Sequence, residues 1–67
     1  MSETVELELE FRAYSYTEIF FYDGARHGRL PISQIQNYTI REIMGLEPYS
    51  MIMVEVPTWL AKNEGLI

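Results

Sequence analysis

The sequence predicts a mainly β domain: a four- or five-stranded antiparallel sheet or a small SH3-like open barrel, with one short C-terminal helix. Three observations predict this class. Residues 4–13 alternate apolar and charged side chains, which is the two-residue period of a half-buried strand. Residues 18–22 are rich in aromatics and precede Asp23-Gly24, a strong turn signal. Residues 51–56 are nearly all apolar, and Pro57 after them suits the first position of a helix.

The elements follow in order. Residues 4–13 form the first strand, residues 18–22 the second and residues 25–30 the third. Within the third strand we expect Gly28 to mark a bulge, and Pro31 ends the strand because it lacks a backbone donor. Residues 51–56 form a further strand, which we expect to be central because of its apolar composition. Residues 58–64 form the helix, and Gly65 stops it.

The segment between residues 32 and 50 is ambiguous. Ile32 and Ile35 suit one helical turn, residues 36–40 favour a strand, and residues 45–50 favour a loop around Pro48. We expect Met44, Met51 and Met53 to fill gaps in the core rather than to form an adaptable binding groove. The predicted core consists of Val5, Leu7, Leu9, Phe11, Ile19, Phe21, Leu30, Ile35, Ile52, Val54, Val56, Trp59 and Leu60.

Composition limits the classes of function. The 67 residues predict a single domain, residues 1–67. The chain has no cysteine and one histidine, so we expect no disulfide, no metal site and no cofactor. A net charge of −5 disfavours nucleic-acid binding, which needs cations to neutralise phosphates. The apolar runs are too short to cross a membrane, and the N-terminal stretch Met1 to Thr4 lacks signal-peptide features. We therefore expect a cytoplasmic protein.

Two stretches of sequence carry a resemblance. One contains Thr17-Glu18, then Asp23-Gly24, then residues 30–35 (LPISQI), and the other is residues 56–67 (VPTWLAKNEGLI). Together they resemble small phage and prophage proteins that have no assigned activity. Arg29 stands where that pattern has tryptophan, and Ile32 stands where it has lysine. The resemblance implies a β fold and a phage context, and it assigns no functional residues.

The first hairpin provides the candidate interface. If the alternation continues past Phe11, four aromatic residues share the face opposite the core: Tyr14, Tyr16, Phe20 and Tyr22. Such a set is typical of protein interfaces, although a bend at Ser15 would break the alternation. Glu6, Glu8 and Glu10 line one face of the first strand, either as an ordinary solvent face that protects a strand edge or as a strip that mimics nucleic acid.

Arg26, His27 and Arg29 form a candidate basic spot, which is alternatively a solvated turn. No serine lies in a nucleophile motif, and a chain of this size leaves little room for the cleft that paired carboxylates need. We therefore expect no enzymatic activity and no catalytic residues.

The sequence favours a non-enzymatic protein-interaction module that docks on a host protein or on its own copy as a homodimer. Two alternatives stay open. One is a small nucleic-acid-binding β-barrel that uses the same aromatics with Arg12, Arg26, Arg29 and Arg41. The other is a structural subunit whose strand edges pair between copies.

Overall fold

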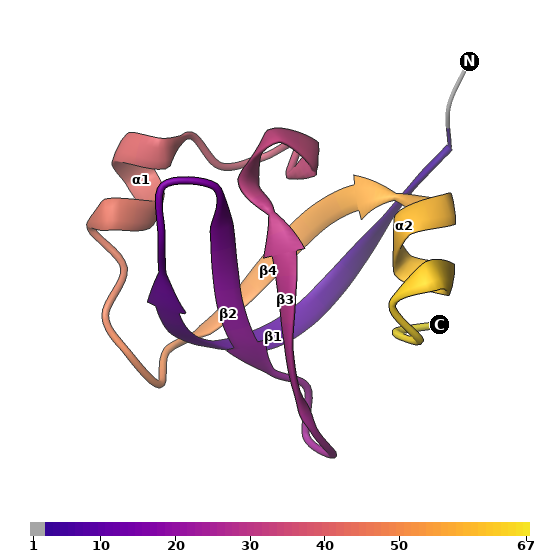
Figure 1. Cartoon of the computed structure of the whole chain (residues 1–67), viewed down its shortest axis with the longest axis horizontal. Helices are drawn as coiled ribbons and strands as arrows, with labels where there is room; N and C mark the ends of the chain where they lie inside the picture. Colours follow the sequence, from indigo (N-terminus) through magenta and orange to yellow (C-terminus); the bar gives the residue numbers. More distant parts are fainter. Residues whose placement is uncertain (1–2) are drawn as a thin grey trace.

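The fold is a four-stranded antiparallel sheet with two short α-helices at opposite ends of the molecule (Figure 1). The computed structural model describes residues 3–67, so Met1 and Ser2 of the N-terminal stretch lie outside the described residues. The elements are β1 (Thr4–Tyr14), β2 (Glu18–Tyr22), β3 (His27–Pro31), the 3₁₀ turn η1 (Ile32–Gln34), α1 (Ile40–Met44), β4 (Met51–Pro57) and α2 (Thr58–Asn63). The predicted mainly β fold with a short C-terminal helix is confirmed.

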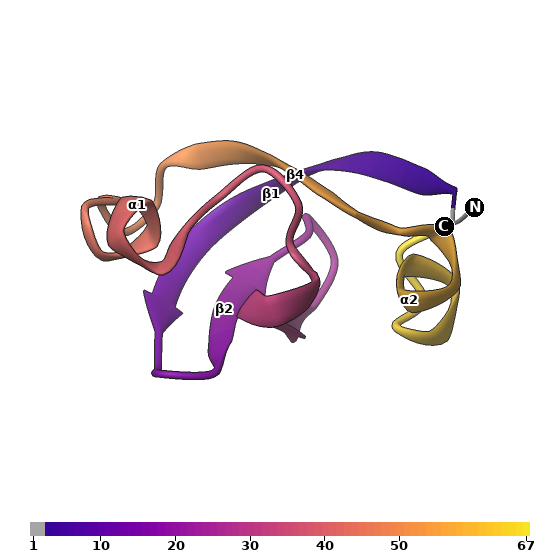
Figure 2. The ribbon, with the colours of Figure 1, turned by 90° about the horizontal axis from the view of Figure 1, so that it is seen from above.

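The strand order is β3-β2-β1-β4, and each neighbouring pair is antiparallel. Strands β1 to β3 form a meander, and β4 returns to pair with β1. The sheet is open, with β3 and β4 at its edges, so the expectation of a central position for residues 51–56 is wrong. Strands β1 and β4 run together as long curved ribbons (Figure 2). No helix among residues 3–67 is long and apolar enough to span a membrane.

The core lies on one face of the sheet because each strand alternates. Leu7, Leu9 and Phe11 of β1 are buried, while Glu6 before Leu7 and Glu8 between Leu7 and Leu9 are exposed. The full core is Leu7, Leu9, Phe11, Ile19, Phe21, Leu30, Ile35, Ile43, Ile52, Val54, Val56, Leu60 and Ala61. Each fully buried side chain of this kind contributes about 1.5–3 kcal/mol relative to an exposed one. This set contains eleven of the thirteen predicted residues; Val5 is only partly buried.

Trp59 is the one clear error in the predicted core, because its side chain is 53% exposed. Helix α2 buries Leu60 and Ala61 instead. Successive residues of a helix are about 100° apart, so a helix that directs Leu60 and Ala61 to the sheet turns Trp59 toward solvent.

A β-bulge interrupts the alternation in β1. Phe11 lies opposite Phe21 and Ala13 lies opposite Phe20, which makes Arg12 an extra residue. Beyond the bulge, Tyr14 pairs with Ile19, a core residue. The alternation is therefore reversed beyond the bulge. Continued from the first part of β1, it would put Tyr14 on the face opposite the core, but Tyr14 lies on the same side of the sheet as Ile19. Gly28 faces Phe21 in continuous register, so the bulge expected at Gly28 is wrong.

The ambiguous segment contains η1 and α1 and adds no fifth strand. The hydroxyl of Thr39 accepts from the Glu42 amide, and the Glu42 carboxylate accepts from the Thr39 amide. This capping box starts α1, which buries Ile43. Residues 36–40 are not a strand. Even so, the Gln36 amide donates to the Glu55 carbonyl at 2.7 Å, on the free edge of β4.

Candidate interaction surface

The face of the sheet opposite the core is called here the outer face. Its side chains are fixed by the same alternation that builds the core, since neighbouring residues of a strand point to opposite sides. It comprises Glu6, Glu8, Glu10 and Arg12 of β1, Phe20 and Tyr22 of β2, His27 and Arg29 of β3, Met51, Met53 and Glu55 of β4, and Tyr49 from the preceding loop. Both helices pack with the core rather than on this face.

Arg12 organises the centre of the outer face. Its Nε lies 2.7 Å from a Glu10 carboxylate oxygen, an ion pair that is not aligned as a hydrogen bond. Its guanidinium lies 4.6 Å from the centre of the Tyr49 ring and 5.5 Å from that of Tyr22, within the range of cation–π attraction. The Tyr22 and His27 rings are 5.0 Å apart. These contacts hold the rings of Tyr22, His27 and Tyr49 in place on the outer face.

Tyr49 reaches Arg12 by an unusual backbone conformation. Its φ is 71°, in the left-handed region that costs a side-chain-bearing residue free energy. Its amide donates to the Phe11 carbonyl at 2.7 Å, and the Phe11 amide donates to the Ser50 carbonyl at 2.8 Å. These two bonds fix the loop against β1, and the Tyr49 side chain remains 68% exposed.

Strand β4 adds methionines to the outer face. Met51 is 56% exposed and Met53 is 45% exposed, so the expectation that they fill the core is wrong. Met44, on α1, is also exposed. The signal was present in the sequence: Met51, Met53 and Glu55 alternate with buried residues along β4.

The acidic strip lies beside these methionines. Glu6 faces Glu55 directly across the β1–β4 ladder, and Glu8 faces Met53. Among residues 3–67 the ion pairs are Arg12–Glu10 and Arg29–Glu18. Glu6, Glu8 and Glu55 therefore have no cationic partner within that described range; the Glu55 carboxylate accepts a hydrogen bond from the Thr4 hydroxyl at 2.7 Å. The predicted strip is thus split, because Glu10 is neutralised by Arg12.

The predicted aromatic set is divided between two places. Phe20 and Tyr22 lie on the outer face with the glutamates. Tyr14 and Tyr16 instead line a hollow of about 360 Å³ with Ile40 and Met44 of α1. The bulge at Arg12 causes this division, because it reverses the alternation before Tyr14. Tyr16 is 98% exposed in the turn.

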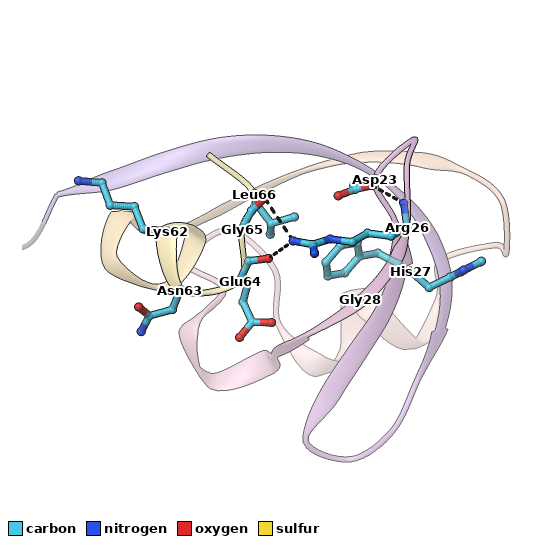
Figure 3. A pocket seen from close by; sticks show the side chains of 10 residues that line it. Asp23, Arg26, His27, Gly28, Lys62, Asn63, Glu64, Gly65 and Leu66 are labelled. Atoms are coloured by element: carbon cyan, nitrogen blue, oxygen red, sulfur yellow. Dashed lines mark hydrogen bonds between the residues drawn. The ribbon is translucent and has the colours of Figure 1, made fainter.

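The predicted basic spot is also divided. His27 and Arg29 lie on the outer face, where Arg29 pairs with Glu18 at 3.5 Å. Arg26 turns the other way, and its guanidinium donates to the Glu64 carbonyl at 3.0 Å and to the Gly65 carbonyl at 3.5 Å. Figure 3 shows Arg26 reaching the end of α2 while Lys62 points away. The cationic side chains therefore do not converge on one ligand.

Arg26 lines a cleft of about 370 Å³ between the β2–β3 turn and α2. The turn is held by Asp23, whose carboxylate accepts from the amides of Arg26 and Ala25 at 2.9 and 2.8 Å. These bonds, that of Arg26 first, hold the pKa of the Asp23 carboxyl below its ordinary value. The cleft thus has a structural explanation, since its polar groups join the hairpin to the C-terminal helix.

Comparisons with protein-family models, with curated proteins and with solved structures found no match to this chain. Within residues 3–67 no three histidine or acidic side chains come together as a candidate metal site.

Proposed function

We propose that the chain is a non-enzymatic protein-interaction module that docks on a partner protein through the outer face. The observation that carries this proposal is the cluster of Tyr49, Met51 and Met53, three large side chains that are about half or more exposed on one side of the sheet. Single exposed apolar residues need no explanation, but a contiguous group marks an interaction site. From the sequence resemblance we add a phage or prophage context to this proposal.

The composition of the outer face supports a protein partner. Tyrosine, methionine and arginine are enriched in interfaces. The Arg12 guanidinium lies over the rings of Tyr22 and Tyr49, and Met51 lies opposite Glu10, the ion-pair partner of Arg12. The rings of Tyr22 and Tyr49 are held by the Arg12 guanidinium, so docking does not have to immobilise these two side chains and costs less entropy. Methionine side chains adapt to partners of different shape.

Nucleic-acid binding has weaker support. Phe20, Tyr22 and His27 would offer stacking rings. Three of the four arginines that this alternative uses are already engaged, however: Arg12 with Glu10, Arg29 with Glu18, and Arg26 with backbone carbonyls. The fourth, Arg41, lies on α1 rather than on the outer face. The remaining glutamates on the same face would repel phosphates.

Assembly by pairing of strand edges is also less favoured. At the β4 edge, the Asn37 side chain donates to the Met53 carbonyl at 2.7 Å and accepts from the Glu55 amide at 2.9 Å. At the β3 edge, the strand is five residues long and ends at Pro31. Covered, short and proline-terminated edges resist pairing with another chain.

The experiment is affinity capture from nuclease-treated lysate of the organism that encodes or hosts the chain, with a matched pair of variants. Met51→Ser with Met53→Ser alters the outer face, and Met44→Ser alters an equally exposed methionine on α1. We expect a stoichiometric protein that the wild type and the Met44 variant retain and the double variant loses. Equal capture by all three proteins, or capture that disappears with nuclease, would contradict the proposal.

A further inference from the structure

The acidic part of the outer face brings together like charges that no cation among residues 3–67 neutralises. Glu6 and Glu55 are directly opposite each other on neighbouring strands, and Glu8 is two residues along β1 from Glu6. Like charges at such positions destabilise a sheet. The two ion pairs of the described residues use Glu10 and Glu18, so three carboxylates remain uncompensated side by side.

The neighbouring methionines make this region more than an acidic cluster. Met53 lies opposite Glu8, and Met51 lies opposite Glu10. An exposed apolar row on β4 therefore runs beside an acidic row on β1. Lysine and arginine fit such a pair of rows, since their aliphatic stems cover apolar surface while their charged ends stay polar.

We propose that the Glu6, Glu8, Glu55, Met51 and Met53 part of the outer face binds an extended basic segment of a partner protein. This inference rests on the proposed function and specifies the chemistry of the partner. Alternate residues of a strand are about 6.8 Å apart, so Glu6 and Glu8 match lysines or arginines at alternate positions of an extended segment. When the aliphatic part of one lysine or arginine of the partner packs on Met53, its charged end reaches Glu8. The charged end of the next lysine or arginine then reaches Glu6 and Glu55.

The probe is a short fluorescent peptide of alternating lysine and alanine, added to isotope-labelled protein at low and at high salt. We expect amide chemical-shift changes centred on Glu6, Glu8, Met53 and Glu55, and binding that weakens with salt because the charges are exposed. A peptide with glutamate in place of lysine should cause no shifts.

Two variants of equal net charge test the location. One changes Glu6, Glu8 and Glu55 to Gln, and the control changes Glu3, Glu47 and Glu64 to Gln, three exposed acids outside the outer face. We expect the first to weaken peptide binding by about tenfold or more and the control by about twofold or less. Equal weakening by both variants, shifts centred elsewhere on the wild type, or no binding at low salt would overturn the inference.

The same variants separate this inference from the proposed function. If lysate capture is lost with the methionine variant but unchanged with Glu6→Gln, Glu8→Gln and Glu55→Gln together, the chain is an interaction module whose partner is not recognised by its basic residues. If neither set of variants changes capture, the proposed function itself fails.

Discussion

The ring of Phe21 lies directly over Gly28 on the neighbouring strand: a Cβ at residue 28 would be 2.7 Å from the Cζ atom of the ring. Phe21 is almost fully buried, so its ring cannot move aside without disturbing the core. The absence of a side chain at Gly28 therefore leaves space for the buried ring of Phe21.

We expect Gly28→Ala to lower the free energy of unfolding by about 1–3 kcal/mol, the usual cost of overpacking. The control is Gly45→Ala. Gly45 has a φ of −91°, and a Cβ added there would meet only the Glu42 carbonyl oxygen, at 3.6 Å, so that change should alter stability by less than about 1 kcal/mol. Urea denaturation of both variants measures the difference, and equal stabilities would show that the Phe21 ring adapts.

Asn37 closes the free edge of β4 with its side-chain amide. We expect Asn37→Ala to lower the free energy of unfolding by about 1–2 kcal/mol, because two hydrogen bonds are lost. The uncovered edge should also promote self-association at high concentration. The measurements are denaturation and sedimentation velocity. Gln36→Ala is the control, since Gln36 contacts β4 through its backbone, and an equal loss in both variants would contradict this role of Asn37.

Arg26 joins the β2–β3 turn to the end of α2. We expect Arg26→Ala to cost about 0.5–1.5 kcal/mol of stability and to speed hydrogen exchange at the Leu66 amide, which donates to the Ala61 carbonyl at 2.8 Å. Lys62→Ala, at an exposed cation that points away from the cleft (Figure 3), should leave that exchange unchanged. Unaltered Leu66 exchange in the Arg26 variant would show that the contact does not hold the C-terminal residues.

Asp23 should give the turn a pH dependence. Its pKa is lowered in the folded chain, chiefly by the Arg26 amide and then by the Ala25 amide. The two hydrogen bonds to the ionised carboxylate therefore stabilise the folded chain fully above the ordinary aspartate pKa. This stabilisation is lost as the pH falls through the lowered pKa of Asp23. An NMR titration of the carboxyl should show a midpoint below that of an unstructured peptide. Asp23→Asn keeps an acceptor and should remove this part of the pH dependence, and an unshifted midpoint would contradict the proposed bonds.

Much of the fold could be predicted because burial follows the alternation of β1 and the aromatic composition of β2. The sequence also contains the signature of the capping box of α1, a threonine at residue 39 followed by a glutamate at residue 42. It was missed because the neighbouring residues 36–40 have strand-like composition, and a local hydrogen bond at Thr39 outweighs that preference.

The candidate site was less predictable, for a physical reason. The residues around Arg12 carry no sequence signal for a bulge. The position of the bulge depends on how β1 pairs with β2 and β4 at the same time. Its position decides which side Tyr14 faces. Tyr49 likewise reaches the outer face only through a left-handed backbone conformation. The sequence does not predict this conformation, because a tyrosine in a loop does not favour it.

The strand order also has a consequence for how the chain folds. The β1–β2–β3 meander joins segments close in sequence, whereas Thr4 and Glu55, which meet across the β1–β4 ladder, are 51 positions apart. Because closing a long loop costs more entropy than closing a short one, we expect the meander to form first and β4 to add afterward. Until β4 adds, β1 has an unpaired side, and we expect its alternating glutamates to disfavour association between partly folded chains.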